Sequence, residues 1–159
     1  MKRKTIIKTS LLLIGIGILT AAGTIYYMFN MPHRDVQASK TDYVLQAGQL
    51  IKEYLSDPSS ANDKYLDESG ESKILEISGQ VASISEDFNQ QKVVLLKSQE
   101  NKAGVSCTFT HETNGSLEGI HTGQHIIVKG VIRAGASYDK DLQMYENVIM
   151  EKCDLISII

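Results

Sequence analysis

Five segments of alternating apolar and polar residues follow one another between residues 73 and 156, and they constrain the fold more than any other feature of the sequence. Such alternation places apolar side chains on one face of a β-strand. The segments are KILEISGQVASIS, QKVVLLKS, AGVSCTFTHE, QHIIVKGVIRA and LQMYENVIMEKCDLI. Short turn-like stretches separate most of them, whereas the longer TNGSLEGIHTG joins the third to the fourth. This pattern predicts a five-stranded OB-fold barrel over residues 73–156, with another small antiparallel barrel or sandwich as the alternative.

Two details of the strand pattern refine this prediction. Gly79 and Gly130 lie inside the first and fourth segments, where a small barrel has to bend its strands. In the fifth segment, Met150 and Cys153 fall on opposite faces of a regular strand. We therefore expect a bulge between residues 150 and 153 that brings both side chains to the same face.

Apolar residues at helical spacing precede the barrel. The stretch TDYVLQAGQLIKEYLSD predicts a helix over residues 43–57, capped by Thr41 or Asp42 and ended by Pro58. A loop or a broken second turn is expected after Pro58. Tyrosines of this region are expected to pack the helix onto the barrel; they are Tyr43, Tyr54 and Tyr65. The expected fold is mainly β, with one N-terminal domain helix and a transmembrane helix before it.

The N-terminus combines a basic cluster with a long uncharged run. Thr9 to Phe29 contains no charged residue, and as a helix this run would span about 31 Å, close to the thickness of a bilayer core. The preceding basic residues are Lys2, Arg3, Lys4 and Lys8. We therefore expect a cytoplasmic basic N-terminus (1–8), a transmembrane signal-anchor helix (9–29), a linker (30–42) and the OB-fold domain (43–156). A cleaved secretory signal and a buried core helix are the alternatives.

The charge balance argues against nucleic acid as a partner. From residue 31 onward the chain has 12 Lys and Arg against 19 Asp and Glu, a net charge of about −7. OB domains that bind single strands stack bases on aromatic residues, and the expected outward residues of the third strand are Ser106, Thr108 and Thr110.

No catalytic, cofactor or metal site is expected, and the chain is not expected to be an enzyme. His121 and His125 have the i, i+4 spacing of helical zinc ligands, but Gly123 between them indicates a loop. The tripeptide His33-Arg34-Asp35 lacks the asparagine that a kinase catalytic loop requires.

The two cysteines are the only candidate site residues. Cys107 lies midway along the third strand and Cys153 near the end of the fifth, and these strands are neighbours in an OB barrel. Facing residues of neighbouring strands lie within the Cα separation that a disulfide accepts. For an exported domain we expect a Cys107–Cys153 disulfide; two buried reduced thiols are the alternative.

Several short motifs between residues 31 and 156 resemble the tRNA_anti-like family, whose members are small bacterial OB-fold proteins, often behind a membrane segment or signal. The matching residues are Ala61, Lys64-Tyr65, Ile77-Gly79-Val81, Val105-Cys107-Phe109, Gly123, Val128-Lys129-Gly130 and Cys153. The usual lysine before the first strand follows an inserted ESGES, and no cysteine follows Ile132-Arg133. The resemblance implies the fold and carries no established activity.

These observations predict a single-pass protein of the bacterial cytoplasmic membrane whose C-terminal domain faces the periplasm or the cell exterior. The domain would be a binding module for a peptide, a glycan or an envelope protein. A structural protein of an envelope complex is the alternative, and a nucleic-acid-binding OB domain is a further one.

Overall fold

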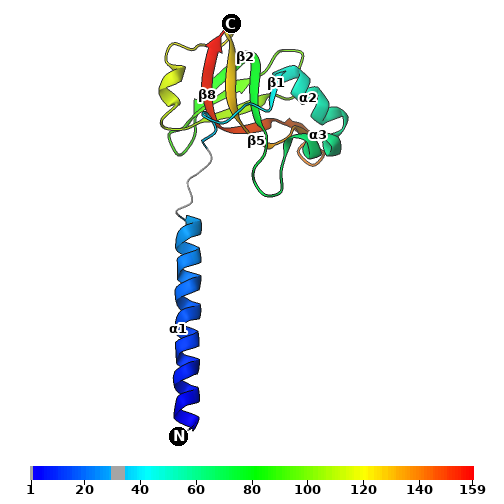
Figure 1. Cartoon of the computed structure of the whole chain (residues 1–159). Coiled ribbons are helices and arrows are strands. Elements are labelled where there is room, and N and C mark those ends of the chain that lie inside the picture. The colour runs from blue at the N-terminus through cyan, green and yellow to red at the C-terminus, as the bar shows by residue number, and fades with distance from the viewer. Residues whose placement is uncertain (1, 30–34) are drawn as a thin grey trace. The chain divides into compact units, whose positions relative to one another are not determined.

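The computed structural model describes residues 2–29 and 35–159, which fall into an N-terminal helix and a compact unit from Asp35 to Ile159 (Figure 1). The helix, α1, runs from Lys2 to Phe29. Two helices of the compact unit are α2 (Ala47–Ser56) and α3 (Pro58–Tyr65). The strands are β1 (Tyr43–Gln46), β2 (Ile74–Glu86), β3 (Lys92–Leu96), β4 (Val105–Phe109), β5 (His125–Ala134), β6 (Ser137–Asp139), β7 (Met144–Glu146) and β8 (Val148–Ile158).

Five of these strands form the predicted closed barrel. The sheet has the order β1-β2-β3-β4-β8-β5, and β2 pairs with β5 to close it. β4 and β8 run parallel, and the other barrel pairs are antiparallel. The connection from β4 to β5 carries a short 3-10 helix, η1 (Asn114–Leu117). The mainly β fold class and the OB-fold barrel are confirmed.

Inward-facing apolar residues of all five barrel strands form one core with α2. Leu50, Ile51 and Tyr54 of α2 are buried in it. Gly130 is required where β5 meets β8, because a Cβ there would lie 2.6 Å from Cys153 Sγ. The bulge in the last strand is also confirmed, since Cys107 pairs with Met150 and Phe109 with Cys153, which leaves one extra residue in β8.

The start of the predicted helix over 43–57 is wrong. Residues 43–46 form β1, which pairs in parallel with the first half of β2, and α2 begins only at Ala47. Asp42 does not cap the helix; its carboxylate accepts the backbone N–H of Ile74 at 2.8 Å. Pro58 does end α2, but the segment after it forms the helix α3, whose N-cap is Asp57.

The second half of the predicted linker packs on the outside of the barrel, whereas residues 30–34 lie outside the described part. Val36 is buried against Ile74 and Val131. The Nζ atom of buried Lys129 donates to the carbonyl oxygens of Gln37 at 3.0 Å and Ser39 at 2.7 Å. The lysine of the Val128-Lys129-Gly130 motif therefore holds the chain that enters the domain.

Within the ranges that the structure describes, no helix is both long and apolar enough to cross a membrane, so the predicted transmembrane helix over residues 9–29 is not supported.

Candidate functional site

The loop between the last two barrel strands folds into a small hairpin that carries two tyrosines. β6 and β7 pair with Tyr138 opposite Tyr145, and the two ring centroids lie 4.8 Å apart. The turn is held by the Asp139 carboxylate, which accepts the backbone N–H groups of Asp141 at 2.8 Å and Leu142 at 3.0 Å. The hairpin thereby presents two neighbouring aromatic rings at the side of the barrel.

Between this hairpin, the α2–α3 turn and the β3–β4 loop lies a cavity of about 450 Å³, which we call the tyrosine pocket. Its lining residues are Tyr54, Leu55, Pro58, Lys102, Ser137, Tyr138 and Tyr145. The Nζ atom of Lys102 lies 5.3 Å from the centroid of the Tyr145 ring, within cation–π range. The hydroxyl of Ser137 is hydrogen-bonded to the Glu146 carboxylate. Aromatic and aliphatic groups thus dominate the wall, and a few polar groups lie among them.

Tyr54 is the buried member of the pocket. Only 1% of its surface is exposed, and its ring lies so close to the β5–β6 connection that a Cβ on Gly135 would come within 1.9 Å of Tyr54 Cε1. Its hydroxyl has no hydrogen-bond partner among the described residues. Burial, and secondarily the neighbouring Tyr65 and Glu53, raise the pKa of Tyr54 to about 12. The neutral phenol hydroxyl of Tyr54 is therefore enclosed by protein and is not accessible from the cavity.

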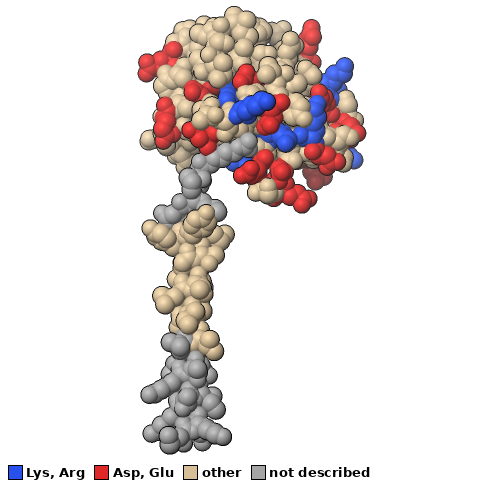
Figure 2. Space-filling view, viewed as in Figure 1, with Lys and Arg blue, Asp and Glu red and all other residues tan. Residues whose placement is uncertain are grey.

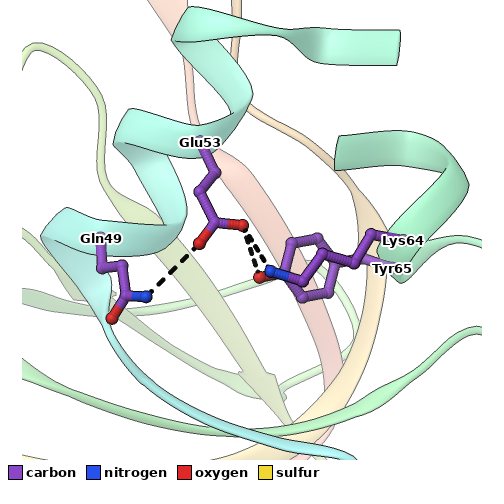
Figure 3. A network of polar contacts seen from close by, with 4 residues as sticks. All are labelled: Gln49, Glu53, Lys64 and Tyr65. Carbon is purple, nitrogen blue, oxygen red and sulfur yellow. Dashed lines mark hydrogen bonds and ion pairs between the residues drawn. The ribbon is translucent and has the colours of Figure 1, made fainter. Parts of the chain in front are cut away.

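A polar network joins α2 to α3 (Figure 3). One carboxylate oxygen of Glu53 accepts from Lys64 Nζ at 2.9 Å and from the Tyr65 hydroxyl at 2.7 Å. Gln49 donates to the other oxygen at 3.4 Å. Hydrogen bonding by Lys64 and then by Tyr65 lowers the pKa of Glu53. Because the Tyr65 ring lies 6.0 Å from the Tyr54 ring, this network fixes the support on which the pocket is built.

The outer face of β3 and β4, where OB domains stack nucleobases, carries neither aromatic nor charged side chains. Val93 pairs with Thr108 and Leu95 with Ser106 on this face, whereas Phe109 is fully buried in the core. On the molecular face shown in Figure 2, the basic side chains lie among acidic ones and form no continuous stripe.

A second cavity of about 410 Å³ lies beside the start of α2 and is lined mostly by polar residues. They include Gln80, Lys97, Glu100, Asn101 and His125. The Lys97 ammonium donates to the backbone carbonyl of Lys102 at 3.1 Å. Apart from Tyr54, the described residues have no buried side-chain nitrogen or oxygen that lacks a hydrogen-bond partner, so this cavity gives no comparable sign of a ligand.

His121 and His125, which have the i, i+4 spacing, lie in two different elements. His121 belongs to the turn before β5, and His125 is the first residue of that strand. Over residues 2–29 and 35–159, no group of three or more His, Cys, Asp or Glu side chains is placed to hold a metal ion.

Cys107 and Cys153 are both fully buried and are free thiols in this structure. Burial, followed by the neighbouring Cys107 thiol, raises the pKa of the Cys153 thiol. The two residues therefore meet in the core, as the neighbouring strands require, and their oxidation to a disulfide stays a prediction.

Comparison with known proteins gives the family. The tRNA_anti-like family model matches residues 1–144. The chain belongs to the tRNA_anti-like family. No curated protein matches the sequence. One similar solved structure is a crystal structure of a "putative nucleic acid-binding lipoprotein" from Klebsiella pneumoniae. The two structures have a TM-score of 0.52 and 13% sequence identity. The match covers 80% of this chain and 100% of the Klebsiella chain. At this identity the likeness shows the fold alone.

In this tRNA_anti-like protein the family motifs serve the fold. Ala61 is a buried residue of α3, Lys64 and Tyr65 bind Glu53, and the Lys129 ammonium holds the entering chain. None of the motif residues lines the tyrosine pocket. The sequence does not reveal the pocket, because the stretch between the fourth and fifth segments has the pattern of a short turn. The seven-residue spacing of Tyr138 and Tyr145 around Asp139 is the signal that would have indicated a hairpin with paired rings.

Proposed function

We propose that this chain is a non-catalytic, extracytoplasmic binding module that holds its ligand in the tyrosine pocket. The pocket itself carries the proposal: it is a cavity of about 450 Å³ whose wall combines the exposed ring of Tyr138 and the part-buried ring of Tyr145 with the ammonium group of Lys102. Small-molecule sites have this size and are lined mainly by apolar and aromatic groups with a few polar ones. The connection between the fourth and fifth barrel strands is also a place where OB domains bind their ligands.

A location outside the cytoplasm is supported by the order of charges at the N-terminus. Four basic residues in the first eight are followed by 21 residues without charge, and the acidic domain comes after them. This order is typical of segments that direct export, whether they are later cleaved or kept. A reporter active only outside the cytoplasm, fused after Ile159, should be active, and activity from a cytoplasm-only reporter would contradict the location.

Capture from the cell envelope tests the binding function. Full-length protein on a support should retain a component of an envelope extract, and Tyr138→Ala should lose it because Tyr138 is 47% exposed and contributes a ring to the pocket. Phe88→Ala is the matched control, since Phe88 is a fully exposed aromatic residue that lies outside the pocket. Equal retention by all three proteins would contradict a ligand site at the pocket.

Nucleic acid on the outer face of β3 and β4 is the competing function, and the name of the Klebsiella structure favours it. The charge of about −7 from residue 31 onward and the absence of stacking rings on that face weigh against it. We expect no salt-sensitive retention of single-stranded DNA or RNA, and tight binding that weakens steeply with salt would support the competing function instead.

A further inference from the structure

We propose that Asn114 is a modification site, at which loss of the side-chain amide group opens a contact between two surface segments. These segments are the turn between β2 and β3 and the connection between β4 and β5, in which Asn114 begins η1. Neither segment lines the tyrosine pocket, so this site does not rest on the proposed function.

The Asn114 side chain holds the two segments together, and we call this contact the Asn114 clasp. Its oxygen, Oδ1, accepts the backbone N–H of Lys92 at 2.8 Å, and its nitrogen, Nδ2, donates to the backbone carbonyl of Gln90 at 2.9 Å. The Lys92 ammonium donates in turn to the backbone carbonyl of Asn114 at 3.1 Å. The clasp uses both the acceptor and the donor of one amide group, and an ionised aspartate has no donor to replace Nδ2.

The turn on the other side of the clasp contains a residue in an unfavourable conformation. Gln90 has a φ of 61°, in the left-handed region that residues with a Cβ rarely adopt. Within the turn, Asp87 Oδ1 accepts the backbone N–H groups of Asn89 at 2.8 Å and Gln91 at 2.9 Å. The clasp adds the bond to the Gln90 carbonyl, so it helps to keep this residue in place.

Gly115 follows Asn114, and the fold does not require a glycine at this position. Among the described residues, a Cβ on Gly115 would meet no atom within 4 Å, and its φ lies outside the left-handed region that Gly119 and Gly123 occupy. The glycine does matter for reactivity. Because it has no side chain, its backbone nitrogen can approach Asn114 Cγ with little steric hindrance.

The reaction that this pair of residues can undergo is deamidation, and its only co-reactant is water. The backbone nitrogen of Gly115 loses its proton and forms a bond to Asn114 Cγ, while the bond from Cγ to Nδ2 breaks and ammonia leaves. Water then opens the cyclic imide. Attack at the side-chain carbonyl gives aspartate, and attack at the main-chain carbonyl gives isoaspartate.

Both products break the clasp. In the aspartate product a carboxylate oxygen takes the place of Nδ2, 2.9 Å from the carbonyl oxygen of Gln90, and two acceptors at this distance repel each other. The Lys92 ammonium, which is bound to the neighbouring backbone carbonyl, can turn to the new carboxylate. Isoaspartate also adds an atom to the main chain inside η1. The β2–β3 turn, which carries the fully exposed Phe88, is then no longer tied to the β4–β5 connection.

The intact clasp also slows the reaction. Asn114 Cγ has to turn toward the Gly115 nitrogen, and this movement breaks both hydrogen bonds of the side-chain amide. Two such bonds reduce the population of the open form about tenfold or more. The folded chain should therefore deamidate at Asn114 more slowly than the unfolded chain by the same factor.

Incubation of the full chain at mildly alkaline pH, followed by peptide mass spectrometry, tests this site. Asn114 should convert to aspartate and isoaspartate, whereas the exposed Asn89, which precedes Gln90, should stay an amide in the same sample. Conversion should be about tenfold faster or more in guanidinium chloride. Gly115→Ala should slow the conversion of the unfolded chain about tenfold or more, because its Cβ hinders the attack.

NMR spectra of the full chain test the opening of the clasp. Asn114→Asp should shift the backbone signals of Gln90 and Lys92, and incubated wild-type protein should develop the same shifts. Asn62→Asp is the matched control, since Asn62 is an exposed residue of α3, and it should leave both signals unchanged.

Each part of the proposal has a result that would overturn it. An unfolded chain that keeps its amide at Asn114 as long as at Asn89 would show that Asn114 is not a modification site. Equal rates in the folded and unfolded chains would show that the clasp does not protect it. Unchanged signals of Gln90 and Lys92 in Asn114→Asp would show that the modification does not open the clasp.

Discussion

Replacing Tyr54 with phenylalanine should make the ligand-free protein more stable. The substitution keeps the ring, which packs against Gly135 and the core, and removes only the hydroxyl. An unpaired buried hydroxyl costs about 1–3 kcal/mol, so the free energy of unfolding should rise by about 1 kcal/mol. For a domain of this size, that gain corresponds to an increase in Tm of about 3–5 °C.

Urea unfolding of the full chain, followed by circular dichroism, measures this change. The midpoint should move to higher urea with an unchanged m-value, which indicates altered stability without altered compactness. Tyr65→Phe is the matched control with the opposite sign. The Tyr65 hydroxyl donates to the Glu53 carboxylate at 2.7 Å, so its removal should cost about 1.5–3 kcal/mol.

A loss of stability in Tyr54→Phe as large as that in Tyr65→Phe would refute the reasoning. It would mean that the Tyr54 hydroxyl has a strong partner in the ligand-free protein.

Three further predictions concern the rest of the domain. Lys129→Met should lower the free energy of unfolding of the domain by about 1–3 kcal/mol in urea, because the carbonyl groups of Gln37 and Ser39 lose their donor. A change within experimental error would show that Lys129 does not hold the chain that enters the domain. Glu53→Gln should be less stable than the wild type at pH 7 and equally stable at low pH. The pKa of the Glu53 carboxyl is lowered in the folded protein, so its ionised form stabilises the fold above about pH 4.5, and this contribution is lost as the pH falls through the folded pKa. A difference in stability that persists at low pH would contradict this prediction. In protein recovered from outside the cytoplasm, Cys107 and Cys153 should form a disulfide. By closing a loop of about 46 residues, this bond should add about 4 kcal/mol to the free energy of unfolding. Two free thiols per chain, counted after denaturation without a reductant, would show that the cysteines stay reduced.

The sequence was sufficient for the barrel because each strand has one buried face. The alternation of Val105, Cys107 and Phe109 follows directly from that burial, and so does the bulge that brings Cys153 to the inside. The strand β1 could not be predicted in the same way. Its residues fit helical spacing equally well, and its pairing with β2 decides the outcome, which is a tertiary effect.

The tyrosine pocket could not be predicted from the sequence. Tyr54 belongs to α2, Lys102 to the β3–β4 loop, and Tyr138 and Tyr145 to the hairpin. Each residue type is ordinary in its own segment, and only the closed barrel brings the segments together. Gly135 lies next to the pocket, and the Tyr54 ring occupies the space that a side chain at this position would need. The sequence shows the glycine, but only the folded chain shows why a glycine is needed there.

The most direct test of the central claim is an NMR titration of the full chain with the envelope component that the immobilised protein retains. The account predicts saturable shifts in the signals of Tyr138 and Lys102, which line the tyrosine pocket. Saturable shifts confined to the outer face of β3 and β4, or to the polar cavity lined by Gln80 and His125, would contradict it.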